Sequence, residues 1–145
     1  MLSSLQLNSC HIERVSVAEN DLFDPKTSVQ TGNVSIDAGD PEKVSDSVYT
    51  VRLAVKVGPS EGEETRIPYV IEASCCGTFR LEQEDDDTRQ LLQFNGPAIL
   101  LGAVRMQIAQ LTAMGRFGPL WIPVMNLMPD AQEQPEEAEG AVAAP

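Results

Sequence analysis

The amino-acid sequence predicts an α+β fold in which one long helix packs on one face of an antiparallel sheet. Residues 48–57 alternate between apolar and polar side chains, which is the period of a strand with one covered and one solvated face. Residues 97–114 are rich in helix-forming residues and carry the strongest helix signal in the chain. The acidic residues 129–145 include few large apolar side chains, so we expect a domain over residues 1–128 followed by a disordered tail.

Three further segments with strand character complete the predicted sheet. Residues 58–64 (GPSEGEE) follow the clearest strand and are too few for a parallel crossover, so they are predicted to form a hairpin connection. Residues 88–94 could form a short separate helix before the long one. The remaining strands are predicted at residues 5–17, 34–36 and 65–79.

The long helix is expected to begin at Pro97 and to stop at Gly115, because proline suits the first turn of a helix and glycine the position after its end. At about 100° per residue, this helix has two apolar faces. The bulkier face is predicted to cover the sheet, and the smaller face to meet the same helix of a second subunit across a two-fold axis. Alternatively, the short helix at residues 88–94 or the C-terminal segment covers the smaller face. The bulkier face carries Leu100, Leu101, Val104, Ile108 and Leu111, and the smaller face carries Ile99, Gly102, Met106, Ala109 and Ala113.

The composition narrows the range of partners and compartments. A formal charge of −12 over 145 residues repels phosphates, so nucleic acid is not an expected partner. No apolar run reaches the roughly 18 residues that span a bilayer, and the N-terminus lacks the pattern of a signal peptide, so we expect no membrane insertion and a cytoplasmic location. Three cysteines are too few for a disulfide scaffold. Adjacent Cys75 and Cys76 would point to opposite faces of a strand, which suits neither a metal site nor a shared bridge.

Side chains that could carry catalysis are sparse, and we predict that the protein is not an enzyme. His11 is the only histidine and lies on a predicted strand, where a structural role is more common than a role as general base. The acidic run at residues 82–87 lacks the glycine and the ligand spacing of a calcium loop, so it is interpreted as a solvated turn. The sequence contains no nucleophile elbow, phosphate-binding glycine loop or zinc-spaced cluster.

Two non-periodic segments with large apolar side chains favour binding over catalysis. They span residues 21–29 and 117–128, and both contain proline. Such side chains either complete the core or form an accessible apolar surface, and the sequence alone leaves both possibilities open. Each large side chain that a bound peptide buries fully would contribute about 1.5–3 kcal/mol, so several together could hold an unfolded chain without recognising its sequence.

Residues 96–126 (GPAILLGAVRMQIAQLTAMGRFGPLWIPVMN) resemble the long helix and the following segment of the SecB family of chaperones. In that family the helix begins Cys-Pro, carries an arginine midway, ends in glycine and leads through a Phe-Pro-Pro-Leu run to Pro-Val-Asn. Residues 48–57, GEET at residues 62–65 and Gly-x-Phe at residues 77–79 also match in order and spacing, so the resemblance covers residues 5–126. The matching residues of the helix and the run after it are Pro97, Leu100, Arg105, Ile108, Gly115, Phe117, Pro119, Leu120, Pro123, Val124 and Asn126.

The resemblance implies a four-stranded antiparallel sheet backed by helices and assembled as a dimer of dimers, that is, a homotetramer without catalysis or cofactor. It further implies an ATP-independent holdase that binds unfolded precursor proteins in apolar grooves and passes them to the ATPase SecA for protein export. In the family's SecA-docking surface, Val70 and Glu72 match, whereas Arg14 and Ala18 stand at positions that are usually acidic. The groove positions would be Leu22, Phe23, Phe117, Leu120, Trp121 and Ile122.

The chain also departs from the family pattern. Gly96 stands where the family usually has cysteine, Met125 is inserted before Asn126, and no second helix is predicted after Met128. A groove without that helical cover would be more open. Some family members chaperone the antitoxin of a toxin–antitoxin pair, and this function, or that of an adaptor dedicated to one partner, is the alternative to a role in export.

Overall fold

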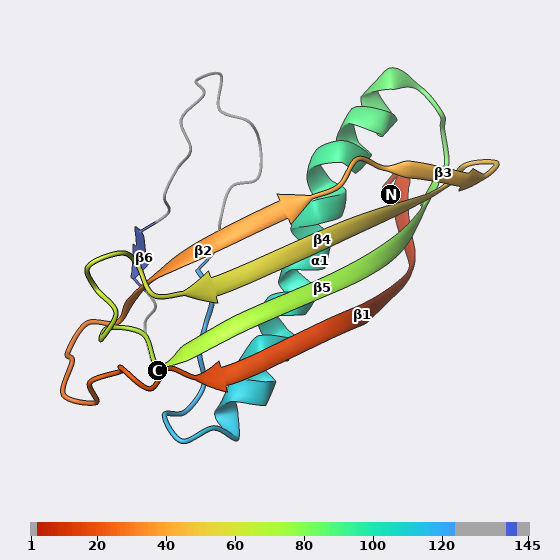
Figure 1. Ribbon diagram of the computed structural model, residues 1–145. Coiled ribbons are helices and arrows are strands. Elements are labelled where there is room, and N and C mark those ends of the chain that lie inside the picture. The colour runs from red at the N-terminus through yellow and green to blue at the C-terminus, as the bar shows by residue number, and fades with distance from the viewer. Residues whose placement is uncertain (1–2, 124–138, 142–145) are drawn as a thin grey trace.

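The computed structural model describes residues 3–123 and 139–141, which form one sheet and one long helix (Figure 1). The elements are β1 (Leu5–Glu19), β2 (Thr31–Ala38), β3 (Glu42–Ser45), β4 (Val48–Gly58), β5 (Tyr69–Leu81), α1 (Asp86–Ala113) and β6 (Glu139–Ala141). The strand order is β1-β5-β4-β2-β6, with β3 paired to one end of β4 and all pairs antiparallel. Helix α1 crosses one face of this sheet (Figure 1).

The predicted fold class is confirmed, because four longer strands form an antiparallel sheet with one long helix on one face. The strands predicted at residues 5–17, 34–36, 48–57 and 65–79 correspond to β1, β2, β4 and β5. The short strand β3 was not predicted. It forms a tight hairpin with β4, in which Ser47 adopts a positive φ of 59° at the turn.

The C-terminal segment differs in part from the prediction. Within the expected disordered tail, the structure describes only Glu139–Ala141, and these residues form β6 by pairing with residues 31–33 of β2. The expectation of disorder is therefore not met at these three residues. The rest of residues 129–145, and the residues 124–128 used in the resemblance, lie outside the described residues.

Apolar side chains from one face of the sheet and one side of α1 form a single core. Every second residue of β4 from Val51 to Val57 is buried, as the alternating pattern predicts. The helix approaches the sheet closely at Gly77 of β5, where an added Cβ would lie 2.6 Å from Leu100 Cδ2. Glycine at position 77 therefore permits the contact between β5 and α1. The helix contributes Leu92, Leu100, Leu101, Val104 and Ile108 to the core.

The helix is one continuous element of 28 residues, so the predicted start at Pro97 and the separate short helix at residues 88–94 are both wrong. Asp85 caps the helix by accepting a hydrogen bond from the Thr88 N–H at 2.8 Å, and Asp86 and Asp87 in the first turn suit the helix dipole. Pro97 lies inside the helix, where it removes one backbone hydrogen bond. Its side chain is buried.

The last turns of α1 depart from the predicted division into faces. Leu111 was assigned to the bulkier, sheet-covering face, but its side chain is 36% exposed. The C-terminal end of α1 extends past β1, the edge strand of the sheet (Figure 1). The buried positions of this half of the helix recur every four residues, at Leu100, Val104, Ile108 and Thr112. Four residues turn about 40° past one full turn, so the buried side has rotated away from Leu111.

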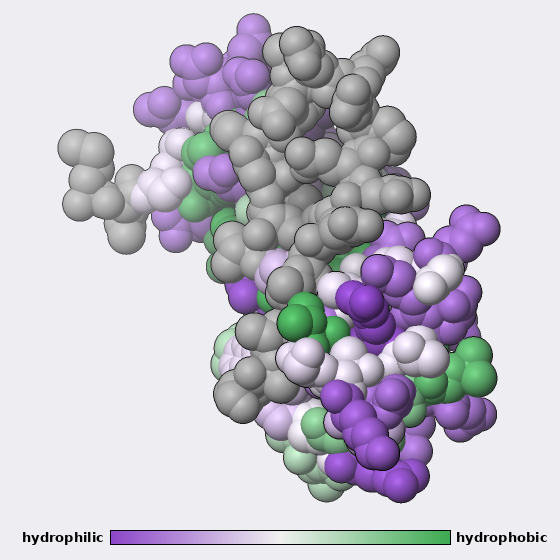
Figure 2. Space-filling model, turned by 90° about the vertical axis from the view of Figure 1, so that its left-hand side faces the viewer, coloured by the Kyte–Doolittle hydropathy of each residue, from purple (hydrophilic) through white to green (hydrophobic). Residues whose placement is uncertain are grey.

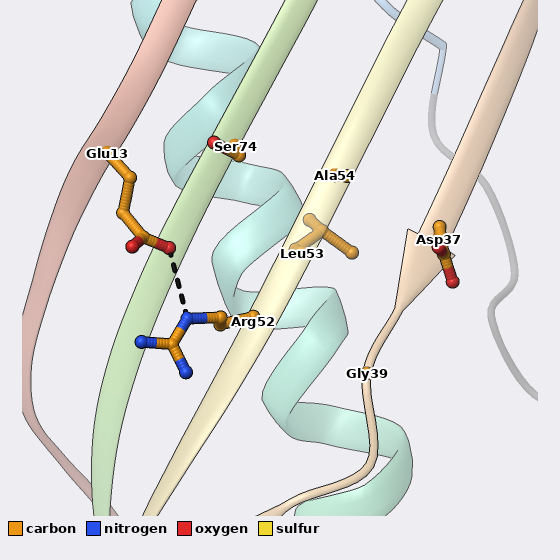
Figure 3. A pocket seen from close by; sticks show the side chains of 7 residues that line it. All are labelled: Glu13, Asp37, Gly39, Arg52, Leu53, Ala54 and Ser74. Atoms are coloured by element: carbon orange, nitrogen blue, oxygen red, sulfur yellow. Dashed lines mark ion pairs between the residues drawn. The ribbon is translucent and has the colours of Figure 1, made fainter.

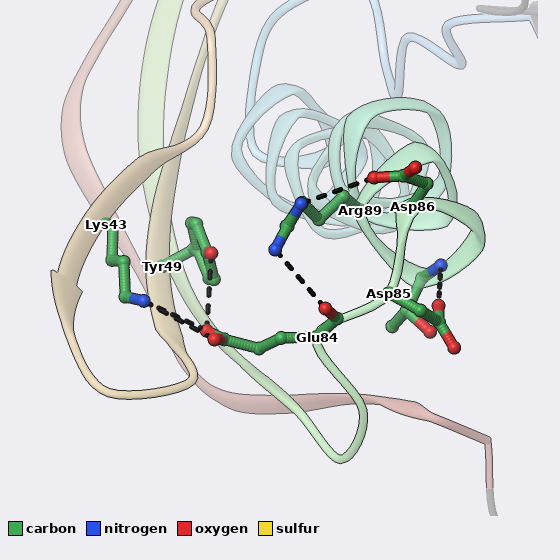
Figure 4. Close-up of polar contacts among 7 residues, drawn as sticks. Lys43, Tyr49, Glu84, Asp85, Asp86 and Arg89 are labelled. Carbon is green, nitrogen blue, oxygen red and sulfur yellow. Dashed lines mark hydrogen bonds and ion pairs between the residues drawn. The ribbon is translucent and has the colours of Figure 1, made fainter.

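Glu84, just before α1, contacts the β3–β4 hairpin through hydrogen bonds and an ion pair (Figure 4). Its carboxylate lies 3.2 Å from Lys43 Nζ and accepts hydrogen bonds from the Ser47 N–H at 3.1 Å and the Tyr49 hydroxyl at 3.3 Å. These contacts, above all the hydrogen bond from Lys43, lower the pKa of Glu84 from its ordinary value of 4.5. The predicted solvated turn is thus exposed, yet Glu84 and the capping residue Asp85 have defined partners.

Replacing Glu84 with Gln is expected to lower the thermal unfolding midpoint at neutral pH, because the ionised carboxylate makes these contacts. The folded-state pKa is lowered, so the stabilisation is present above the ordinary value of 4.5 and is lost as the pH falls through the lower folded-state pKa. The difference between the two chains should therefore shrink on acidification, which circular dichroism melts over a pH series would measure. Glu61→Gln, in the exposed β4–β5 connection, is the control. A midpoint difference that does not vary with pH would contradict this role of the Glu84 charge.

Candidate functional site

The segment after α1 is held in place by the buried hydroxyl of Tyr69. This hydroxyl accepts a hydrogen bond from the Phe117 N–H at 3.0 Å and donates one to the Gly118 carbonyl at 3.0 Å. Tyr69 reaches the segment over Gly115, where an added Cβ would lie 2.5 Å from the hydroxyl oxygen. Gly118 has a φ of +78°, a conformation that favours glycine. The chain therefore turns back along the helix immediately after α1 ends.

Two helix side chains hold the rest of this segment. The Thr112 hydroxyl accepts a hydrogen bond from the Leu120 N–H at 2.7 Å and donates one to the Ile108 carbonyl at 2.7 Å. Arg105 Nε donates a hydrogen bond to the Ile122 carbonyl at 2.7 Å. Because the backbone is bonded at these points, Leu120 and Ile122 face inwards, and each is 1% exposed, whereas Trp121 between them is 38% exposed.

The loop between β1 and β2 meets the segment after the helix through aromatic rings. The rings of Phe23 and Phe117 are 4.8 Å apart between centroids and meet edge to face, and the Tyr69 ring lies 6.1 Å from that of Phe117. Asn20 anchors the start of the loop, because its side-chain amide donates to the carbonyls of Glu64 and Ile67, both at 2.8 Å. Leu22, beside this cluster in the sequence, is 63% exposed.

The structure therefore brings together part of the predicted groove and corrects the rest. Phe23 and Phe117 are in contact and half-buried, while Leu22 and Trp121 are accessible. Leu120 and Ile122 were predicted to line the groove, but they belong to the core. The hydrogen bonds from Thr112 and Arg105 turn these two side chains inwards. The roles of Tyr69 and Thr112 in holding this segment were not predicted from the sequence. The one indication was that Thr112 lies about two helical turns after Arg105 and so points in the same direction.

The smaller face of α1 is exposed except at Ala109. Ile99 is 41% and Met106 52% exposed, and a Cβ added at Gly102 would meet no atom within 4 Å. Ala109 is only 3% exposed, so its assignment to an open face is wrong. It lies one turn from both Arg105 and Thr112, on the side of the helix that the folded-back segment covers. Among the residues of the smaller face, only Ala109 is covered by the chain after the helix, as the alternative prediction proposed for the whole face. Ala113 is exposed.

The sheet face opposite α1 carries paired charges over a floor of small side chains (Figure 3). Arg52 Nε lies 3.4 Å from a carboxylate oxygen of Glu13, and Lys56 Nζ lies 3.9 Å from one of Glu72. A cavity of about 410 Å³ opens on this face. It is lined by Glu13, Asp37, Gly39, Arg52, Leu53, Ala54 and Ser74 (Figure 3).

The predicted SecA-docking residues lie together on this charged face. Val70 pairs with Ala18, and Glu72 pairs with Ser16 on one side and Lys56 on the other. Opposed residues of an antiparallel pair share one face, and Arg14 joins them through its pairing with Ser74. Val70 is 40% exposed. Glu72, which matches a residue of the family's SecA-docking surface, therefore lies next to Lys56 of the same chain.

The environment of Cys75 does not favour a reactive thiol. Burial, followed by the nearby Cys10, Cys76 and Glu13, raises the pKa of Cys75 to about 12, so this thiol stays protonated. Within residues 3–123 and 139–141, no group of three or more His, Cys, Asp or Glu side chains is placed to hold a metal ion. Among the same residues, no helix is both long and apolar enough to cross a membrane.

Comparison with known proteins identifies the family. A family model described as "Preprotein translocase subunit SecB" matches residues 5–132. The chain belongs to the SecB family. It is 27% identical over 118 residues to the protein-export protein SecB of Anaplasma phagocytophilum, covering 78% of this chain and 75% of that protein. It is also 27% identical over 121 residues to the protein-export protein SecB of Alcanivorax borkumensis, covering 83% of this chain and 74% of that one.

Other matches are shorter or show the fold alone. The protein-export protein SecB of Ehrlichia canis is 32% identical over 88 residues, and this match spans 54% of the present chain and 49% of that protein. A solved structure of a SecB-like chaperone from Mycobacterium tuberculosis, in complex with a ChAD peptide from the HigA1 antitoxin, superposes with a TM-score of 0.61. It is 15% identical and covers 83% of this chain and 90% of that one. SecB-family chaperones are non-enzymatic, in agreement with the prediction that this protein is not an enzyme.

Replacing Tyr69 with Phe is expected to destabilise the fold. The change leaves the Phe117 N–H and the Gly118 carbonyl without their partner, and an unsatisfied buried polar group costs about 1–3 kcal/mol. Urea unfolding would measure the loss. Tyr49→Phe is the matched control, because the Tyr49 hydroxyl bonds only the exposed Glu84 carboxylate, and its effect should be smaller. Equal effects of the two changes would show that the Tyr69 hydroxyl is not important for holding this segment.

Proposed function

We propose that the protein is an ATP-independent holdase that binds unfolded precursor proteins for SecA-dependent export. The observation that carries this proposal is that a chain of the SecB family exposes Leu22 and Trp121, close in sequence to the half-buried Phe23 and Phe117, whose rings are in contact. This surface requires no nucleotide or cofactor to become accessible. Several such side chains can bind apolar segments of many sequences, because burial of apolar area is not directional.

The way in which the surface is held supports binding. Phe117 and Trp121 lie on a backbone that Tyr69, Thr112 and Arg105 bond at fixed points. A segment that is ordered before a peptide arrives does not lose conformational freedom on binding, and this improves affinity. The buried Leu120 and Ile122 serve as anchors for the segment, so they contribute to the site without contacting a client.

Replacing Trp121 with Ser is expected to weaken the binding of an unfolded polypeptide by roughly tenfold, because one large side chain no longer buries apolar area. Val44→Ser is the control, since Val44 of β3 is an apolar residue outside this surface and is more accessible than Trp121, at 55% against 38% exposure. Light scattering of an aggregation-prone client, with excess chaperone, measures holding. Unchanged aggregation in the presence of the unmodified protein would contradict the holdase proposal, and equal loss in both variants would exclude Trp121 as a specific contact.

We further propose that the exposed face of α1 joins two subunits across a two-fold axis, and that two such dimers form a dimer of dimers. Ile99, Gly102, Met106 and Ala113 form this face, whereas Ala109 is buried within the protomer. Packing within the protomer does not explain Gly102, because a side chain at this position would point into open space. A second backbone that approaches closely would explain a small residue at this position.

Met106→Glu is expected to reduce the assembly to smaller species, because it places like charges against each other across a two-fold axis. Gln90→Glu is the matched control: it adds the same charge to an exposed position of the same helix, about 160° around the axis from Met106 and so outside this face. Sedimentation velocity would give the mass of each variant. An unchanged mass for Met106→Glu would show that this face does not join the subunits.

Delivery to SecA is proposed to use the charged sheet face around Val70 and Glu72. Arg14 and Ala18 make this face less acidic than the family pattern, and Lys56 lies next to Glu72. A second candidate function is to chaperone one dedicated partner such as an antitoxin, and the M. tuberculosis SecB-like chaperone, with its antitoxin peptide, supports this alternative. A pull-down from cells that recovers many unfolded chains together with SecA would support export, and one stoichiometric partner would support the alternative.

A further inference from the structure

The outer edge of β2 is only partly used. On its inner side, β2 pairs with β4 from Asn33 to Ala38. On its outer side it pairs with β6 through residues 31–33 alone. Among the residues that the structure describes, no strand pairs with the outer side of residues 34–38. In Figure 1, β6 lies beside the beginning of β2 and leaves the rest of this edge open.

This edge lacks the features that normally prevent strand addition. Exposed edges are commonly protected by lysine, proline, bulges or very short strands. The sequence of β2, TGNVSIDA, contains neither lysine nor proline and carries Asp37 as its single charge. Its pairing with β4 runs from Asn33 to Ala38 without a register shift. The pairing with β6 shows that the backbone of β2 does accept a further strand.

A pocket adjoins the open part of the edge. It has a volume of about 230 Å³ and opens between the end of β2 and the first half of α1. Ile36 and Ala38 contribute from β2, and their pairing with Val55 and Leu53 places them on the side of the sheet that α1 covers. The lining residues are Ile36, Ala38, Gly39, Asp40, Gln93, Phe94 and Pro97.

We propose that the edge of β2 is a strand-addition site for an extended segment of an unfolded polypeptide, and that β6 is a built-in occupant which the segment displaces. The segment pairs with β2 in the antiparallel sense, as β6 does, and places one apolar side chain in the pocket next to Phe94 and Pro97. Backbone hydrogen bonds along an edge supply affinity regardless of sequence, and a pocket for alternate side chains supplies selectivity. This inference rests on the proposed holding function and names a second contact region for the same clients.

The length of the pairing explains why the client prevails. Strand β6 pairs through three residues of β2, whereas an incoming segment can use all eight residues and the pocket. Short strand pairs are marginally stable, so β6 can be displaced. Other segments can bind only those chains in which β6 has left the edge. Their apparent affinity is therefore reduced in proportion to the fraction of chains with a free edge. Short or weakly apolar segments are then excluded, and residues 31–33 of the edge are covered when no client is present. Figure 2 views the molecule from this side, and where described residues are visible it shows apolar side chains next to hydrophilic ones.

The first test removes β6 from the edge in the full-length protein. Because alternate N–H groups of a strand face its neighbour, the double variant Gly140→Pro/Ala141→Pro removes a donor on either side of β6. The control is Ala143→Pro/Ala144→Pro, which introduces the same residues beyond β6. The probe is reduced, carboxymethylated α-lactalbumin with a fluorescent label, and fluorescence anisotropy gives its Kd. We expect the first variant to bind roughly threefold to tenfold more tightly than the unmodified chain, and the control to bind as the unmodified chain does.

The second test addresses the pocket. Ala38→Glu places a charge at the mouth of the pocket, and Ser35→Glu places the same charge on the opposite face of the same strand, where Ser35 pairs with Lys56. We expect Ala38→Glu to weaken binding of the probe by roughly tenfold and Ser35→Glu to change it little. Equal affinities in the unmodified and Gly140→Pro/Ala141→Pro chains, or equal effects of the two glutamates, would overturn the inference while leaving the holding function intact. Failure of every chain to bind the probe would overturn both.

Discussion

The packing of α1 across β4 and β5 decides which surfaces of this protein are available. The helix approaches the sheet closely enough that Gly77 cannot carry a side chain beneath Leu100. Its bulkier residues are used in this contact, so the side with Ile99 and Met106 faces away from the core. The helix covers one face of the sheet, and it leaves the charged face and the open part of the β2 edge accessible. The subunit, SecA and strand-addition surfaces that we propose are all surfaces that the helix does not cover.

A second constraint is the set of hydrogen bonds from side chains to the backbone after the helix. The segment from Gly115 to Pro123 has no periodic pattern, so helix or strand geometry does not decide which of its side chains face outwards. Tyr69, Thr112 and Arg105 decide it by bonding the backbone at Phe117, Gly118, Leu120 and Ile122. The same bonds explain why Ala109 is covered. The hydrogen bonds of Tyr69, Thr112 and Arg105 thus turn Leu120 and Ile122 into the core and leave Trp121 exposed.

These surfaces suit a chaperone that works without ATP. Such a protein must have its binding surface accessible before the client arrives, and it must remain soluble in that state. The exposed apolar residues Leu22 and Trp121 lie in a chain with a net charge of −12, which opposes non-specific aggregation. The β2 edge differs from these exposed side chains because β6 covers part of it. The described residues thus combine accessible apolar side chains, Leu22 and Trp121, with an edge that the chain's own β6 partly occupies.

The sequence by itself determined the sheet, the helix and the family, because each depends on local periodicity or on a pattern of residues within one segment. The alternation in β4 predicted its buried face, and the resemblance of residues 96–126 to the SecB family was confirmed by the family match. Only the tertiary structure decided the continuity of α1 through Pro97, the burial of Ala109, Leu120 and Ile122, and the pairing of β6 with β2. Each of these depends on contacts between distant parts of the chain. The Tyr69 hydroxyl, for example, meets a backbone 48 residues away, and Glu84 holds a hairpin up to 41 residues before it. A pattern within one segment does not specify which distant groups will meet it, and that is why the site was only partly predictable.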